Sequence, residues 1–337
     1  MKIYYHFSEY ISHRRAGEAY AACLAAMGHE LTANPAASDL VVLHDDPIRY
    51  PALLERMPAA PGRKYVGYAV WETPQLPAVY QRAVAGLDAV WTASAFSREA
   101  FAPHCRAFVL PHVVARLRPA QADIRRIMAL LGMQPSRRED RNCMYFYTIV
   151  DTVNPRKNIE TLLSAFSAAF PETHAPVRLV VKQYRMPQPL DAFPHVIDIP
   201  EMLDDGMIAA LHAVCDCYVS AHHAEAWGLP LSEAMSFGNP VIATGYSGNM
   251  EFMTARNSFP VPYAIAPVSE RMCRALPEMM EPHMTWANID TAALVHTLRR
   301  LRAQPVDAAF RATVAQSMQA FAPQAICGTL QELLDAL

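Results

Sequence analysis

The sequence predicts an α/β fold made of two doubly wound parallel-sheet domains that face each other across a cleft. The chain has 337 residues, and a single hydrophobic core seldom grows beyond about 250–300 residues. Short β-branched runs alternate with longer stretches of helical periodicity, which is typical of parallel sheets covered by helices on both faces. This alternation stops near residue 115 and restarts near residue 143, so we expect two Rossmann-like domains.

The first domain is predicted over residues 1–114. Gly28 follows an Ala-rich helical stretch at the position that glycine favours after a helix, and Ser97 is expected to cap another helix. The first helix of this domain is expected over 17–28. Its five strands are expected over 2–6, 40–44, 64–70, 89–94 and 107–112.

Residues 115–142 are expected to link the domains. The stretch is rich in arginine, carries prolines near both ends and contains one amphipathic helical pattern, which marks a boundary between regular α/β segments. Its arginines favour a solvated linker, with peripheral contact to anionic lipid as the alternative.

The second domain is predicted over residues 143–318, followed by a helical tail over 319–337 that can cross back onto the first domain. Each expected helix stops at a polar residue or glycine. The strands are expected over 144–150, 177–182, 195–199, 216–221 and 240–245, and the helices over 156–170, 207–215 and 229–238.

Composition excludes several classes of protein. The formal charge is −3 and no basic arm with interleaved aromatic residues is present, so nucleic acid is not expected as a partner. No apolar run approaches the ~20 residues that span a bilayer, and the first residues lack the apolar segment of a signal peptide, so we expect a cytoplasmic protein with at most peripheral membrane contact. Seven cysteines without metal spacing are expected to be thiols in a reducing compartment.

The segment "EAWGLPLSEAM" places two carboxylates, Glu225 and Glu233, on either side of a predicted helix start. Ligands of open α/β sheets bind beyond the carboxyl ends of the strands, where helix N-termini offer unpaired amides to a diphosphate. Gly228 allows close approach of a ligand, and Glu233 can accept hydrogen bonds from two neighbouring hydroxyls, as on a ribose. Glu225 would then face the group beyond the phosphates. The alternative is that the helix dipole alone favours a glutamate in this turn.

This segment, followed by "GNPVIATGYSGNMEF", resembles the Glu-x7-Glu signature and following strand of the retaining glycosyltransferases of family 4 (group 1), which have the GT-B fold. The resemblance covers residues 143–260 well and extends through "WETPQLP" and "VWTASAFSREAF". It implies transfer of a sugar, with retention and without a metal or other cofactor, from a nucleotide-sugar donor to a hydroxyl of a glycan or lipid-linked acceptor. Cell-surface polysaccharide or lipopolysaccharide synthesis is the pathway that the family suggests.

By this resemblance, Glu233 holds the ribose and Glu225 the hydroxyls of the donor sugar, while Lys157 in "NPRKNIETLLSAF" neutralises the diphosphate with Arg156 as its neighbour. A cation at a helix start is disfavoured by the dipole unless an anion is present, which gives the assignment a physical reason. Glu225 and Lys157 are the expected catalytic residues. The remaining donor contacts are expected from the turns Trp227, Gly228, Leu229 and Ser247, Gly248, Asn249.

One basic residue of the family pattern is missing. Five positions before Lys157 the family commonly has a second cation, and here that position is Thr152. Lys182, at the end of a predicted strand, is a candidate replacement because a charge at a strand's carboxyl end can point into the cleft. A lysine held in a structural salt bridge is the alternative.

Acceptor contacts are expected from the first domain. Trp71 and Glu72 follow a predicted strand, so Trp71 could stack on a sugar face and Glu72 could accept hydrogen bonds from acceptor hydroxyls, unless both are structural. His6 ends the first strand on the same side. His222 and His223 lack a third metal ligand at recognisable spacing, so we expect them to form hydrogen bonds in the cleft instead of a metal site.

Two other functions compete with glycosyl transfer. The missing cation at Thr152 and the absence of a glycine-rich first loop favour a noncatalytic GT-B protein that binds a nucleotide or a partner protein. A GT-B epimerase or phosphorylase is a weaker rival. The nucleotide base, the sugar, the linkage and the oligomeric state are not specified by these motifs.

Overall fold

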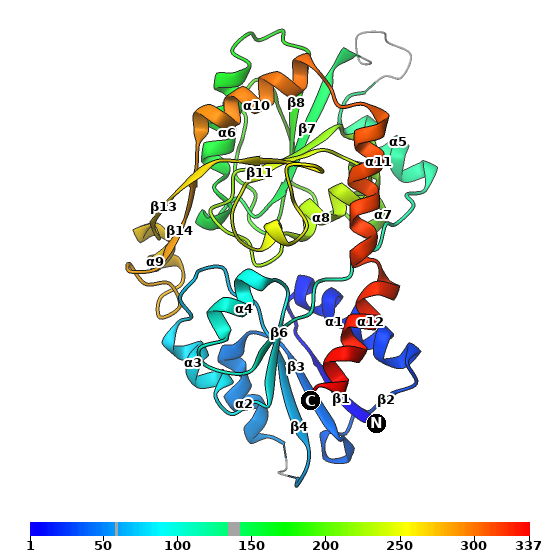
Figure 1. Cartoon of the computed structure of the whole chain (residues 1–337). Helices are drawn as coiled ribbons and strands as arrows, with labels where there is room; N and C mark the ends of the chain where they lie inside the picture. Colours follow the sequence, from blue (N-terminus) through cyan, green and yellow to red (C-terminus); the bar gives the residue numbers. More distant parts are fainter. Residues whose placement is uncertain (58–59, 134–141) are drawn as a thin grey trace.

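The computed structural model describes residues 1–57, 60–133 and 142–337. It has two α/β domains, one above the other in Figure 1, and each contains a six-stranded parallel sheet with helices on both faces. This confirms the predicted doubly wound, two-domain α/β fold.

The first sheet is built from apolar runs that are buried on both faces. Leu40, Val41, Val42 and Leu43 of one central strand are at most 2% exposed, as expected of a parallel strand covered by helices. All pairings in the sheet are parallel. In spatial order its strands are β2 (Glu30–Leu31), β1 (Lys2–Phe7), β3 (Leu40–His44), β4 (Lys64–Tyr68), β5 (Ala89–Thr92) and β6 (Ala107–Val109).

The second sheet repeats this design, with β7 and β10 at its centre. The carboxyl ends of its strands point toward the first domain and carry the loops described below (Figure 1). Its pairings are also parallel. In spatial order its strands are β12 (Phe259–Val261), β11 (Val241–Thr244), β10 (Cys217–Ser220), β7 (Met144–Val150), β8 (Val177–Gln183) and β9 (Val196–Ile199).

The helices around both sheets agree with the predictions in most places and differ at their starts. The serine that caps α4 is Ser94, whose hydroxyl accepts a hydrogen bond from the amide of Ser97, so the prediction of Ser97 as cap was wrong. The helices of the first domain are α1 (Ile11–Ala26), α2 (Tyr50–Glu55), α3 (Ala78–Val84) and α4 (Ala95–Phe101); those of the second are α6 (Ile159–Ala169), α7 (Asp205–Val214), α8 (Leu229–Ser236), α9 (Glu270–Ala275), α10 (Thr291–Ala303) and α11 (Ala308–Ser317).

The stretch expected to be a linker contains α5 (Gln121–Leu130). This helix packs against α7, and Ile127 is fully buried in the core of the second domain. The described part of residues 115–142 therefore packs on the second domain and is not only a solvated linker. The arginines at 137, 138 and 141 lie outside the described residues.

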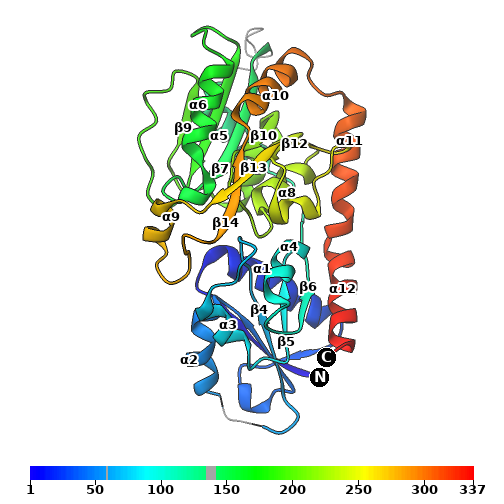
Figure 2. The ribbon, with the colours of Figure 1, turned by 60° about the vertical axis from the view of Figure 1, so that its left-hand side comes forward.

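A two-stranded arm was not predicted. Strands β13 (Tyr263–Pro267) and β14 (Thr285–Ile289) pair antiparallel and, with α9, extend from the second domain toward the first (Figure 2). Trp286 and Met284 of this arm share a buried cluster with Trp71 and Tyr80 of the first domain. The arm therefore joins the hydrophobic cores of both domains.

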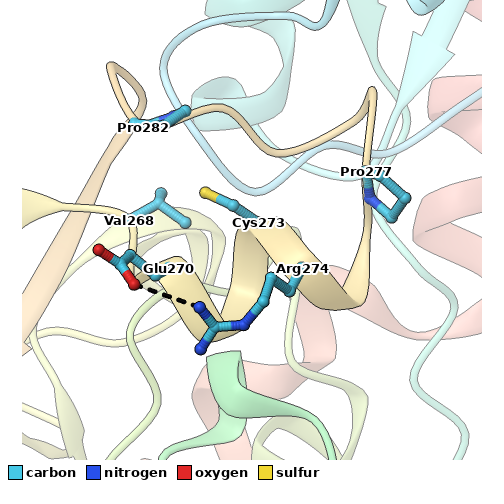
Figure 3. Close-up of a pocket in the computed structure, with 6 residues that line it drawn as sticks. All are labelled: Val268, Glu270, Cys273, Arg274, Pro277 and Pro282. Carbon is cyan, nitrogen blue, oxygen red and sulfur yellow. Dashed lines mark hydrogen bonds and ion pairs between the residues drawn. The ribbon is translucent and has the colours of Figure 1, made fainter.

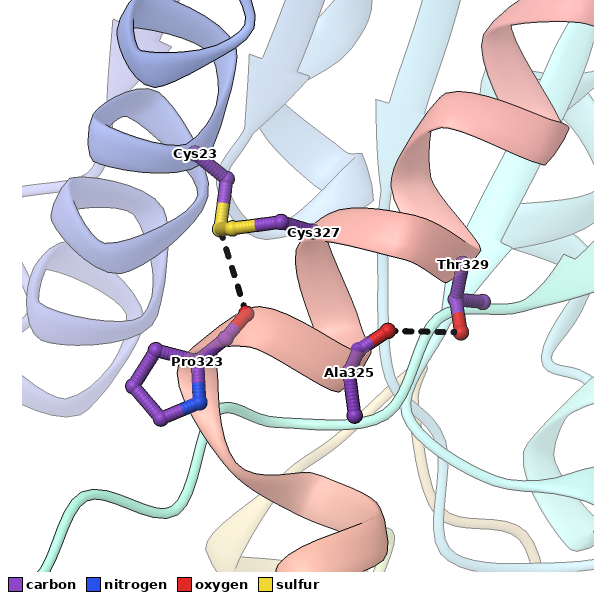
Figure 4. The surroundings of a disulfide bond; sticks show 5 residues. All are labelled: Cys23, Pro323, Ala325, Cys327 and Thr329. Atoms are coloured by element: carbon purple, nitrogen blue, oxygen red, sulfur yellow. Dashed lines mark hydrogen bonds between the residues drawn. A yellow bond between two sulfur atoms is a disulfide. The ribbon is translucent and has the colours of Figure 1, made fainter.

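The C-terminal helix α12 (Pro323–Asp335) returns to the first domain and packs on α1 (Figures 1 and 2). Ile326 and Leu330 of α12 are buried among the apolar side chains of that domain. A disulfide between Cys23 of α1 and Cys327 of α12 fixes this contact (Figure 4). The tail was predicted to cross back, but the expectation that all seven cysteines are thiols was wrong, because crossing back brings two of them together.

We expect the disulfide to stabilise the protein, because it closes a loop of 304 residues and restricts the unfolded chain. Cys327→Ser should lower the free energy of unfolding by about 2–5 kcal/mol, measured by urea unfolding without reductant. Cys273→Ser, which removes a half-buried free thiol, is the matched control. Equal stability of wild type and Cys327→Ser would contradict a stabilising role for the disulfide.

Candidate functional site

Two cations follow the central strand β7. The turn Pro155–Lys157 begins after Asn154, whose side chain accepts a hydrogen bond from the amide of Arg156 at 3.0 Å. Proline fits the first position of such a turn, since its missing N–H costs nothing there. Asn158 then adopts φ 52° and starts α6. This local structure holds Arg156 and Lys157 at the carboxyl end of β7.

Glu225 lies beside these cations because its loop follows β10, the parallel neighbour of β7. The ammonium of Lys157 is 2.6 Å from Oε1 of Glu225, and Nη1 of Arg156 is 3.0 Å from Oε2. Nη1 of Arg156 also donates to the carbonyl of Ala224 at 2.6 Å. The Glu225 carboxylate is thus held between two cations, a group that we call the Glu225 cluster (Arg156, Lys157 and Glu225).

The turn after β11 fixes the backbone of Glu225. Its amide donates to the hydroxyl of Ser247 at 2.7 Å, and its carbonyl accepts from the amide of Gly248 at 2.8 Å. A β-carbon on Gly248 would lie 2.0 Å from the carbonyl oxygen of Ala226, so only glycine fits there. The Gly248 amide, expected to contact the donor, donates to the carbonyl of Glu225 and positions that residue.

Electrostatics keep Glu225 ionised. Burial by itself raises the pKa of this carboxyl, but the positive charges of Lys157 and Arg156 lower it well below its usual range. Burial lowers the pKa of Lys157, and Glu225 opposes that shift. Burial also disfavours the charge of Arg156, but Glu72 and Glu225 outweigh it and raise its pKa. The carboxylate has its charge neutralised by neighbours, which makes it a poor nucleophile.

Glu72 of the first domain completes this arrangement. It follows β4, and its Oε1 lies 3.1 Å from Nη2 of Arg156 in the second domain. Glu72 therefore faces the Glu225 cluster across the interface, on the side where acceptor contacts were expected. Trp71 does not: its indole is 2% exposed and donates to Thr73 and to the carbonyl of Gln75. It packs edge-on against Tyr80, so an indole free to stack on a sugar was a wrong expectation.

Gly228 precedes α8 as predicted, but Trp227 does not have the predicted role of a donor contact. Gly228 has φ 94° and precedes the helix, with Pro230 in the first turn. Trp227 is buried, and its indole N–H donates to the hydroxyl of Ser232 at 3.0 Å. The ring lies against His112 of the first domain. Trp227 is therefore a packing residue at the interface, while partly buried Leu229 packs on the core.

Glu233 lies on α8 (Leu229–Ser236). Its side chain is 37% exposed, and Oε2 is 3.7 Å from Nε2 of buried His212. A partly exposed carboxylate can accept hydrogen bonds from two hydroxyls, so the ribose contact stays a prediction.

Lys182 was expected in the cleft, and the structure places it elsewhere. The residue is fully buried, its ammonium donates to the carbonyl of Gln183 and it lies 4.2 Å from the centre of the Tyr184 ring. Burial lowers its pKa. Thr152, at the position of the missing cation, donates its hydroxyl to the Gln183 side chain at 2.7 Å. Arg156, and not Lys182, is therefore the second cation beside Lys157.

The remaining predicted residues make structural hydrogen bonds. The side chain of Asn249 is fully buried. Its Oδ1 lies 3.1 Å from Nε2 of His222, and its Nδ2 donates a hydrogen bond to the carbonyl of Thr244 at 3.0 Å. His222 is buried, which lowers its pKa to about 4 and keeps it neutral. His6, at the end of β1, lies 3.2 Å from Asp45. Asp45 belongs to none of the motifs found in the sequence.

Sequence reasoning missed the polar contacts between the first loop and the second domain. The Tyr10 hydroxyl accepts a hydrogen bond from Arg185 at 2.7 Å, and the guanidinium lies over the Tyr10 ring. Arg15 of α1 pairs with Asp205 at the start of α7. Spacing alone offers no signal for these pairs, because their partners lie about 175–190 residues apart.

A surface hollow lies at the arm. It is lined by residues of α9 and its flanks, and the Glu270–Arg274 pair borders it (Figure 3). None of the predicted site residues lines it. Within the described ranges no group of three or more metal-ligating side chains occurs, and no helix is long and apolar enough to cross a membrane.

One segment of the chain matches a known family. Residues 137–259, which include the turn with both cations, the Glu225 loop and α8, match the family "Glycosyl transferases group 1". The match covers this segment and supports glycosyltransferase activity for the chain. No curated protein matches the sequence.

Solved structures similar to this glycosyltransferase have the GT-B fold. Sucrose-phosphate synthase from Thermosynechococcus elongatus is 16% identical with a TM-score of 0.65, and the match covers 99% of this chain and 98% of that one. HepE from Anabaena, solved with UDP and glucose, is 15% identical with a TM-score of 0.64 over 100% and 99%. WaaG, a glycosyltransferase involved in lipopolysaccharide biosynthesis, is 14% identical with a TM-score of 0.60 over 97% and 98%.

Replacing Glu225 should destabilise the protein, because it leaves buried Arg156 and partly buried Lys157 without their carboxylate. Glu225→Gln should lower the free energy of unfolding by about 3–5 kcal/mol at pH 7. The folded-state pKa of Glu225 is depressed, so its contribution is present above the unfolded value of about 4.3 and is lost as pH falls toward the folded value.

Urea unfolding of wild type and Glu225→Gln at pH 7 and pH 3 measures this contribution. The difference between the two proteins should be large at pH 7 and smaller at pH 3. Glu160→Gln, which removes a mostly exposed carboxylate paired with Arg271, should change stability little at either pH. A difference that does not shrink at pH 3 would contradict the assignment.

Proposed function

We propose that this glycosyltransferase transfers a sugar with retention from a nucleotide-sugar donor to a hydroxyl of a glycan or lipid-linked acceptor. The observation that carries the proposal is the Glu225 cluster, two cations on one buried carboxylate at the carboxyl ends of adjacent parallel strands. Open α/β sheets bind ligands at this edge. HepE, solved with UDP-glucose, makes a uridine nucleotide the first donor to test.

The donor would lie between the Glu225 cluster and α8. Lys157 and Arg156 would neutralise the diphosphate, aided by the helix start after Gly228. Glu233 would accept hydrogen bonds from the ribose hydroxyls, and Glu225 would orient the hydroxyls of the sugar. No metal is needed in this scheme, since the protein itself supplies two positive charges.

In the transfer, the bond between the anomeric carbon and the diphosphate oxygen breaks, and its electron pair leaves with the diphosphate. The acceptor oxygen forms the new bond on the same face of the sugar, and its proton passes to the leaving phosphate. Lys157 and Arg156 stabilise the negative charge that develops on the diphosphate. Glu225 acts by orientation and not as a nucleophile, because both of its oxygens are held by cations.

Nucleotide binding is the first prediction of this scheme. Among UDP, GDP and ADP, one should raise the melting temperature of the wild type, corresponding to about 2.7 kcal/mol at a concentration 100 times its Kd. Lys157→Ala and Glu233→Ala should each reduce the shift strongly. Glu99→Ala, on the surface of α4 in the first domain, is the control and should keep it. Absence of a shift with all three nucleotides would overturn the proposed donor site.

Retention of configuration is the second prediction. With UDP-glucose and a soluble alkyl glycoside as acceptor, the glycosidic product should have the α configuration of the donor, read from the anomeric coupling in proton NMR. Lys157→Ala should lower kcat by about a hundredfold or more, as expected when a group that stabilises developing charge is removed. A β-linked product would contradict retention but would not contradict the proposed donor site.

A further inference from the structure

Arg156 is shared between the two domains. Its side chain is 10% exposed and pairs through Nη1 with Glu225 of its own domain and through Nη2 with Glu72 of the other. Nη1 also donates to the carbonyl of Ala224. The Nη2 end of the guanidinium is therefore the end that faces the first domain.

The charges of this group balance one another. Arg156 and Lys157 contribute two positive charges, and Glu225 and Glu72 contribute two negative ones. A donor diphosphate brings further negative charge to the same cations. Burial of an unbalanced charge is costly, so one carboxylate has to give up its cation when the diphosphate binds.

Glu72 is the carboxylate that can leave. Glu225 is held by both cations, and its backbone is fixed by Ser247 and Gly248. Glu72 has one ion pair, its side chain is 20% exposed against 7% for Glu225, and it lies in a loop of the other domain. Breaking its pair with Arg156 therefore costs less, because water can solvate the released carboxylate.

We propose that Glu72 is an internal anion that occupies Arg156 in place of the donor diphosphate and is displaced when the donor binds. The inference rests on the proposed function, since it assumes that the diphosphate binds Arg156. Glu72 and the donor then compete for one guanidinium, and the Glu72 contact lowers donor affinity. By linkage, donor binding weakens the same interdomain contact, which frees Glu72 at the face where the acceptor would arrive.

The test is the affinity for UDP, or for whichever of UDP, GDP and ADP binds the wild type, measured by isothermal titration calorimetry. Glu72→Gln should bind the nucleotide about fivefold more tightly or better. Glu72→Asp keeps the charge but is one methylene shorter, so it loses reach to Arg156 and should also bind more tightly. Unchanged melting temperatures would verify that both variants are folded; if Glu72→Gln does not fold, Glu72→Asp carries the test.

Asp205→Asn is the matched control. It breaks the Arg15–Asp205 pair, another contact between the domains, without touching Arg156, and should leave nucleotide affinity unchanged. Equal or weaker affinity in Glu72→Gln would overturn the proposal and leave the donor site standing. Tighter binding in Glu72→Gln with wild-type affinity in Glu72→Asp would also overturn it, in favour of a general effect of charge. A wild type that binds none of the three nucleotides would refute the proposed function itself.

Discussion

The site depends on the pairing of one buried carboxylate with two cations. A buried ion is costly unless it is paired and hydrogen-bonded, and Glu225 meets this condition only because β7 and β10 are adjacent parallel strands. Their carboxyl ends bring the Arg156–Lys157 turn and the Glu225 loop to one edge. The turn around Gly248 then fixes the Glu225 backbone, where a larger residue would clash.

The contacts between the domains serve the same arrangement. Trp286 of the arm and Trp71 of the first domain lie in one buried cluster, and Trp227 packs against His112. The α12 helix, joined to α1 by the Cys23–Cys327 disulfide, ties the end of the chain to the first domain. These apolar and covalent contacts hold the domains close enough for Glu72 to reach Arg156.

Aromatic residues near the site act mainly by packing. Trp71 and Trp227 were both expected to contact a ligand from their places in the motifs, yet each indole N–H donates a hydrogen bond within the protein. Burying a large ring stabilises the fold more than exposing it to solvent would. In the proposed function, the ligand is bound by charged groups: Glu225, Lys157 and Arg156 in the cluster, and Glu233 on α8.

The α/β class, the main strands of both sheets and the motif around Glu225 could be predicted from the sequence, because periodicity, β-branched runs and turn residues act over short stretches. The cation that stands in for the one missing at Thr152 depends on tertiary packing. Lys182 was the expected replacement, but the packing of β8 buries it beside Tyr184, while Arg156, expected only as a neighbour of Lys157, contacts Glu225. The Cys23–Cys327 pair and the Glu72–Arg156 contact join segments far apart in the chain, and such pairings depend on how the domains pack.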